Sequence, residues 1–125
     1  MQGRSKKILI VEDEARLAEV LSDMLSDQGY TITVARDGEQ GLAAAIEQKP
    51  DLILLDILLP KKEGLDMLAQ LREHADGERT KVMVLSNLSD TASVNKAMQH
   101  GAFDFYVKSN WDIDALVEEI KAKLS

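Results

Sequence analysis

The sequence predicts an α/β protein with a doubly wound, five-stranded parallel sheet of strand order 2-1-3-4-5 and helices on both faces. The main observation is that short β-rich runs alternate strictly with longer segments of helical period. This alternation indicates a parallel sheet, because neighbouring parallel strands must be joined by crossover connections, which are usually helices. The runs at 52–55 and 82–85 are continuously apolar, as interior strands are, whereas Thr31–Val34 alternates like an edge strand.

Each strand is predicted from β-branched or apolar residues bounded by turn or helix signals. In chain order the predicted strands are 8–11, 31–35, 52–55, 82–85 and 103–107. The first helix follows from apolar residues at three- and four-residue spacing between Leu17 and Leu25, and Gly29 ends it. The second spans 40–48 between an Asp-Gly turn and Pro50. The other helices are predicted around 65–71, ending near 74–77, at 91–100 before Gly101, and at 113–124.

Composition narrows the class of protein. The 125 residues contain 22 acidic and 15 basic side chains, a net charge of −7, and no cysteine. Disulfides and cysteine-ligated zinc are therefore excluded, and nonspecific binding to nucleic acid or to an anionic membrane is disfavoured. The longest apolar stretch is interrupted at Asp56, and the polar first residues lack a secretory signal. We expect a cytoplasmic protein with one domain over 1–125, in which 1–5 form a polar tail.

Polar residues follow the predicted strands at the edge where parallel sheets bind ligands. The polar residues expected at that edge are Glu12, Asp13, Asp56, Ser86 and Lys108. Neighbouring acids repel one another unless a proton or a cation lies among them, and oxygen ligands suit Mg²⁺. Asp56 lies within an otherwise apolar stretch, where a carboxylate costs several kcal/mol unless it is paired or metal-bound. A carboxylate can also act as a nucleophile toward phosphorus and form an aspartyl phosphate, a transfer that needs mainly positioning and charge neutralisation.

These residues resemble the receiver domain of two-component response regulators, especially the single-domain chemotaxis type, whose fold is flavodoxin-like. The resemblance extends from Lys7 to Leu124. The matching features are the acidic pair at 12–13, Asp56 with Pro60 four residues later and then Gly64, and Ser86, Tyr106 and Lys108 at the later strand ends.

The resemblance implies a phosphoacceptor switch. A sensor histidine kinase or phosphotransfer protein would phosphorylate Asp56, while Asp13, Asp56 and the backbone carbonyl of Leu58 hold Mg²⁺ and Glu12 acts through water. Lys108 would pair with the phosphoryl oxygens. Ser86 would move to bind the phosphoryl group and Tyr106 would turn inward, which changes the surface of the fourth helix, fifth strand and fifth helix.

The resemblance also implies how that change is read out. The changed surface would contact a downstream protein, and it is a candidate for dimerisation on activation. The protein would be no enzyme beyond taking phosphate from donors and releasing it.

Two positions depart from the family pattern. Asn87 stands where a small residue is usual, which predicts an altered lifetime of the phosphorylated form, and Ser109 stands where proline usually follows the lysine.

Alternative readings remain open at the level of sequence. Glu12 and Asp13 are also typical helix-capping residues. A receiver-like interaction module that takes no phosphate is one alternative function. A phosphohydrolase or a flavin carrier is another, although the acidic loop at 12–14 would repel a flavin phosphate.

Overall fold

The computed structural model describes residues 6–56, 64–77, 79–86, 91–102, 104–107 and 112–124. Its strands are β1 (Lys7–Val11), β2 (Thr31–Ala35), β3 (Leu52–Asp56), β4 (Lys81–Ser86) and β5 (Asp104–Val107). Its helices are α1 (Ala15–Asp27), α2 (Gly38–Gln48), α3 (Gly64–Glu73), α4 (Thr91–Gln99) and α5 (Ile113–Leu124), with a short 3₁₀ turn, η1 (Ala75–Gly77), after α3. The predicted alternation of strands and helices is confirmed.

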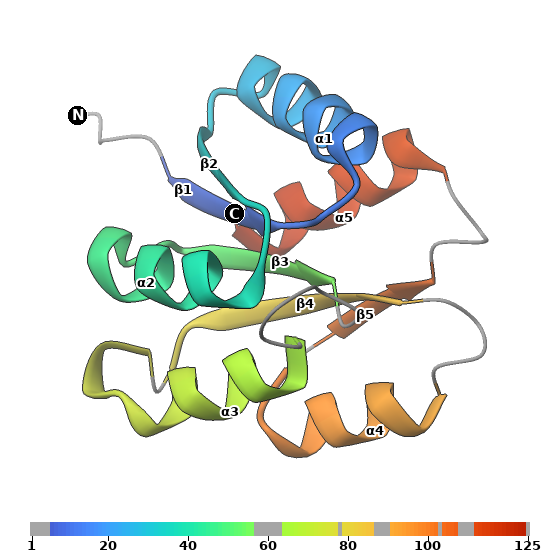
Figure 1. The fold of residues 1–125 in the computed structure, drawn as a ribbon. Coiled ribbons are helices and arrows are strands. Elements are labelled where there is room, and N and C mark those ends of the chain that lie inside the picture. The colour runs from blue at the N-terminus through green and yellow to red at the C-terminus, as the bar shows by residue number, and fades with distance from the viewer. Residues whose placement is uncertain are drawn as a thin grey trace.

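The strands form one parallel sheet of order β2-β1-β3-β4-β5, as predicted. Helices α1 and α5 cover one face, and α2, α3 and α4 cover the other (Figure 1). Successive residues of a strand point to opposite faces, so each interior strand contributes to both apolar layers. In β1, for example, Ile8 and Ile10 join the layer under α1 and α5, while Leu9 and Val11 join the layer under α2 and α3.

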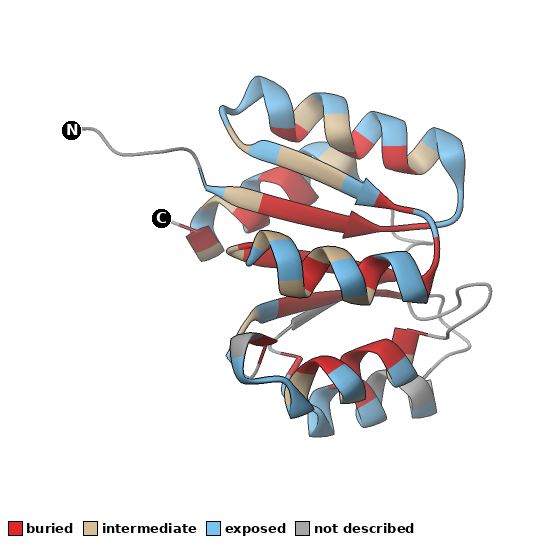
Figure 2. Cartoon of the chain, turned by 60° about the vertical axis from the view of Figure 1, so that its left-hand side comes forward, coloured by how far each residue is buried: buried red, intermediate tan, exposed pale blue. Residues whose placement is uncertain are grey.

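Burial follows the strand positions that the sequence indicates. β3 is buried along its whole length, whereas β2 has exposed or half-buried residues at four of its five positions and lies at the edge. Figure 2 shows the buried residues along the interior strands and on the helix sides that face them. No helix in the described part of the chain has the length and hydropathy needed to span a membrane.

Helix α2 begins two residues before the predicted start, and its cap explains the difference. The Asp37 carboxylate accepts a hydrogen bond from the Gln40 backbone N–H at 2.8 Å, which stabilises the first turn. The Gln40 side chain in turn accepts from the backbone N–H of Arg36 at 3.1 Å. Gly41 lets α2 approach the sheet closely, because a Cβ there would lie 2.8 Å from Val11 Cγ1. The start of α2 is thus fixed against the end of β1.

Candidate functional site

The order of the strands reverses between β1 and β3, and ligands bind sheets of this kind beyond the carboxyl ends of the strands at that point. In the register of the sheet, Val11 lies opposite Leu55. The next residues along these two neighbouring strands are Glu12 and Asp56. Because adjacent strands lie about 4.8 Å apart, the register brings these two acidic positions side by side.

Asp56 is the last residue of β3, so this strand ends one residue later than predicted, and only 7% of Asp56 is exposed. Its register partner on β4 is Leu85. The backbone of Asp56 is held by the pairing of β3 with β4, so the residue's place at the end of the strand is fixed before any ligand arrives. Burial of this charge is costly without compensating interactions. Asp56 therefore has the placement expected of a functional carboxylate.

The loop after β1 carries the other two acids. Glu12 is 1% exposed, its backbone N–H donates to Ala35 O at 3.0 Å, and its Oε2 accepts from the backbone N–H of Glu14 at 3.1 Å. Asp13 is exposed. The residue preceding α1 is Glu14, which makes no side-chain cap bond, so neither Glu12 nor Asp13 is the N-cap residue of this helix. The hydrogen bond from the Glu14 backbone N–H to the Glu12 carboxylate closes the loop that carries Asp13.

Arg36 is a residue that sequence patterns do not reveal. Its Nη2 donates to the backbone oxygen of Asp13 at 2.7 Å and so joins the loop after β1 to the end of β2. The two residues are 23 positions apart, and an exposed arginine beside a turn carries no signal of this contact. The only hint in the sequence is that strands 1 and 2 are neighbours in the predicted order.

On the far side of Asp56, β4 ends at Ser86 and β5 at Val107, and these two residues are register partners. The backbone of Ser86 therefore lies one position beyond the Asp56–Leu85 pair, at the predicted edge of the sheet. Leu58, Asn87, Lys108 and Ser109 lie outside the described residues, so the predicted roles of Leu58, Asn87 and Lys108 stay predictions.

Tyr106 lies in β5 as the register partner of Leu85. Its side chain is half buried and packs against the apolar layer under α1 and α5. The hydroxyl donates to Asp112 O at 3.2 Å and accepts from Asp112 N at 3.0 Å, and the Asp112 side chain caps α5 by accepting from Ala115 N at 3.1 Å. Asp56, Leu85 and Tyr106 are thus successive register partners across the sheet, and the Tyr106 hydroxyl links this row to the start of α5.

The donor set suits a hard cation. Glu12, Asp13 and Asp56 supply only carboxylate oxygens, which Mg²⁺ prefers. Within the described residues, however, no three acidic or histidine side chains lie close enough to hold a metal ion by themselves. The expected convergence of all three carboxylates is therefore not found. Mg²⁺ usually keeps several waters and takes one or two carboxylates, so Asp13 and Asp56 still fit such an ion, with Glu12 turned toward Glu14.

Comparison with known proteins gives one consistent result. Residues 8–121 match the family model of the response regulator receiver domain. The chain is 37% identical over 118 residues to the response regulator ArlR of Staphylococcus saprophyticus, which covers 94% of this chain and 52% of ArlR. It is 35% identical over 124 residues to the DNA-binding response regulator MtrA of Mycobacterium tuberculosis, which covers 99% of this chain and 53% of MtrA. The chain thus spans about half the length of these curated relatives.

Solved structures are similar over almost the whole chain. A CheY-like response regulator receiver domain protein from Methanospirillum hungatei has a TM-score of 0.87 at 27% identity, with 96% of this chain and 94% of that chain covered. The receiver domain of a sensor histidine kinase from Pseudomonas aeruginosa has a TM-score of 0.84 at 27% identity, with 94% and 96% covered. That structure has a magnesium ion coordinated in its active site cleft.

Proposed function

Because this chain belongs to the response regulator receiver domain family, we propose that it is a phosphoacceptor switch whose acceptor is the carboxylate of Asp56. The observation that carries the proposal is the burial of this carboxylate at the end of β3, where the strand order reverses. A carboxylate oxygen of Asp56 attacks the phosphorus of the donor and forms a P–O bond. The bond from phosphorus to the donor atom breaks, and the leaving group keeps its electron pair.

The product is an acyl phosphate, and attack by water returns the carboxylate and inorganic phosphate. We expect a histidine kinase or phosphotransfer protein as the natural donor and a small molecule such as acetyl phosphate as a substitute. Catalysis of such a transfer is mostly positioning and charge neutralisation. Bound Mg²⁺ would supply part of the neutralisation, with Asp13, Asp56 and the carbonyl of Leu58 as protein ligands and Glu12 acting through water. Lys108 would supply a further positive charge, and Ser86 a hydroxyl donor.

The output is proposed to be a change on the surface formed by α4, β5 and α5. Tyr106 belongs to this surface, and its hydroxyl holds the backbone of Asp112 at the start of α5. Inward movement of the tyrosine would break both of these bonds. The phosphoryl state of Asp56 would thereby be linked to the first turn of α5, which a downstream protein or a second copy can recognise.

The experiment is phosphorylation of the purified chain with acetyl phosphate and Mg²⁺, followed by intact-mass analysis. We expect one acid-labile phosphoryl adduct per chain, because only one described carboxylate combines burial with the end of an interior strand. If neither acetyl phosphate nor histidine kinases give an adduct, the chain is a receiver-like interaction module that takes no phosphate.

Arg36 is expected to support Mg²⁺ binding by fixing the backbone of Asp13. Arg36→Ala removes this donor, and loss of one such hydrogen bond is worth about 1 kcal/mol, so the Mg²⁺ affinity should fall about threefold to tenfold. Calorimetric titration with Mg²⁺ measures this affinity. Arg16→Ala in α1 removes the same charge from another exposed position and is the matched control. Equal affinities in Arg36→Ala and Arg16→Ala would show that the contact does not position Asp13.

Asn87 is expected to change the lifetime of the acyl phosphate, since its amide follows the switch hydroxyl directly in the sequence. An amide beside the phosphoryl group either hydrogen-bonds it or restricts the approach of water. Asn87→Ala should therefore change the dephosphorylation rate severalfold, which loss of the adduct with time measures after removal of the donor. Equal decay in the wild type and Asn87→Ala would dismiss a role for the side chain.

A further inference from the structure

A cavity of about 450 Å³ lies at the amino-terminal edge of the sheet, the edge opposite Asp56. Its lining is rich in cationic and hydrogen-bonding side chains and, among the described residues, contains no acid. The polar lining residues are Arg72, Arg79, Thr80, Lys81, Gln99 and His100. The chain as a whole has a net charge of −7, so a cavity whose lining is positively charged differs from the rest of the protein.

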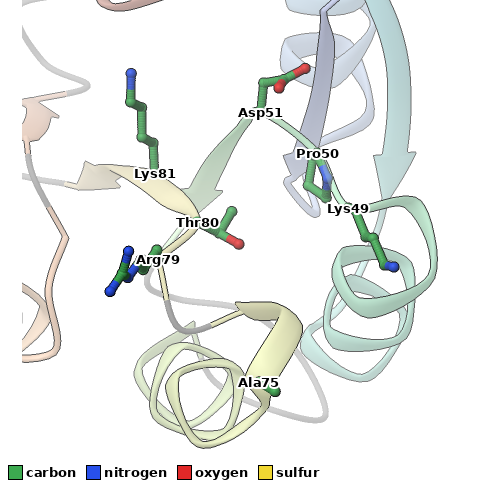
Figure 3. Close-up of a pocket in the computed structure, with 7 residues that line it drawn as sticks. All are labelled: Lys49, Pro50, Asp51, Ala75, Arg79, Thr80 and Lys81. Atoms are coloured by element: carbon green, nitrogen blue, oxygen red, sulfur yellow. The ribbon is translucent and has the colours of Figure 1, made fainter.

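A second cavity of similar volume shares Arg79, Thr80 and Lys81 with it and is also lined by Asp51. Figure 3 shows the Arg79 side chain pointing away from Asp51. The Asp51 carboxylate accepts a hydrogen bond from the backbone N–H of Lys7 at 2.7 Å, so it is turned toward β1. This acid therefore does not neutralise the first cavity, which we call the cationic cavity.

The guanidinium of Arg72 is fixed in the wall of the cationic cavity. Its Nε and Nη1 donate to the backbone oxygens of His100 and Gly77, each at 2.8 Å, and its Nη2 donates to Gly101 O at 3.1 Å. These acceptors are neutral, and burial lowers the pKa of Arg72 below its usual value. The guanidinium is therefore partly buried and held by neutral backbone oxygens, and an incoming anion would find it already in place.

Cations at the ends of helices also complement the helix dipole, which explains part of the lining. Lys81 Nζ donates to Lys123 O at the end of α5 at 3.1 Å, and Arg72 bonds the chain that leaves α4. Interaction with a helix dipole does not account for Arg79, which is exposed and lies outside the last turn of every α-helix that the structure describes. The Lys81 ammonium is held on the α5 side of the sheet, so Arg79 is the charge that adds to the fixed guanidinium of Arg72 in this cavity.

We propose that the cationic cavity binds a phosphate-bearing small molecule. Arginine guanidinium groups match the oxygens of phosphate, and the side chains of Thr80 and Gln99 offer further donors. The volume lies within the range of pockets that hold small ligands. Because the lining comes from α3, the start of β4 and the end of α4, a bound phosphate would join these three elements on the side away from Asp56.

The test is a titration of the Asp56→Asn variant with inorganic pyrophosphate in EDTA, followed by amide NMR shifts. Without Mg²⁺ and the acceptor carboxylate, binding at the proposed phosphorylation site is removed, so the two proposals fail separately. We expect saturable shifts at residues 80–81 and 99–101. Higher salt should weaken the affinity, because the cavity is open to solvent and its charges are screened.

The specificity arm compares two substitutions that remove one charge each. Arg79→Gln should weaken pyrophosphate about fivefold to tenfold, since it deletes a charged donor in the cationic cavity. Lys96→Gln, at an exposed position of α4 outside the lining, should leave the affinity within about twofold. Equal loss in both variants, no saturable shifts, or shifts centred on residues 12–14 would overturn the proposal. Tighter binding of an acidic peptide than of pyrophosphate would overturn the class of ligand.

Discussion

Asp56→Asn is expected to abolish formation of the acid-labile phosphoryl adduct. The amide lacks the anionic oxygen that attacks phosphorus and cannot form an acyl phosphate. Asparagine has almost the same shape as aspartate, so the end of β3 should keep its backbone bonds. Because the substitution removes a charge from a site that is 7% exposed, the free energy of unfolding should stay equal or rise by about 1 kcal/mol. Intact mass and chemical denaturation measure the two effects.

Asp51→Asn is the matched control for this substitution. Asp51 is a half-buried carboxylate beside the first residue of β3, at the opposite end of the strand. Its loss removes one negative charge but should leave the phosphorylation rate within about twofold. If Asp56→Asn gains the adduct at the wild-type rate, the acceptor is another side chain.

Asp13→Asn, or removal of Mg²⁺ with EDTA, is expected to give the second-largest effect. Loss of charge neutralisation at a transferred phosphoryl group costs about 3 to 4 kcal/mol, so phosphorylation from acetyl phosphate should slow at least about 100-fold in EDTA. Asp13→Asn keeps an oxygen ligand but loses its charge. The Mg²⁺ concentration that gives half the maximal rate should therefore rise at least about tenfold.

Glu14→Gln tests whether this effect belongs to Asp13. Glu14 is the next residue of the same loop, is exposed, and contributes its backbone N–H to the bond with Glu12. Its side-chain charge should matter little, and the Mg²⁺ dependence should match that of the wild type. A phosphorylation rate that does not depend on Mg²⁺ in the wild type, Asp13→Asn and Glu14→Gln would contradict a metal site at Asp13 and Asp56.

Much of the fold was predictable because local patterns and topology agree. The apolar run at 52–55 requires a strand covered on both faces, and the alternating run at 31–34 requires an edge, which together limit the order of strands. The position of Asp56 follows from the same logic, since the end of an interior strand at the reversal of order is where ligands bind. The start of α2 was missed because Asp37, interpreted as part of a turn, is its cap.

The long-range side-chain contacts could not be predicted, either at the site or at the cationic cavity. Arg36 reaches Asp13 across 23 residues, and Arg72 reaches His100 across 28, through side chains that are long and flexible. Such contacts depend on how closely two distant segments approach each other. The spacing of apolar residues predicts helices and strands but gives no information about that distance. The same holds for Glu12, whose carboxylate turns to the Glu14 backbone instead of completing a cluster of three acids.

The identity of the phosphorylated residue tests the central claim most directly. Phosphorylated wild-type protein is reduced with borohydride, which converts an aspartyl phosphate to homoserine, and the digested chain is mapped by mass spectrometry. We expect homoserine at position 56 and unmodified aspartate at positions 13 and 51. Homoserine at another carboxylate, with position 56 unmodified, would contradict the assignment of Asp56 as the phosphoacceptor.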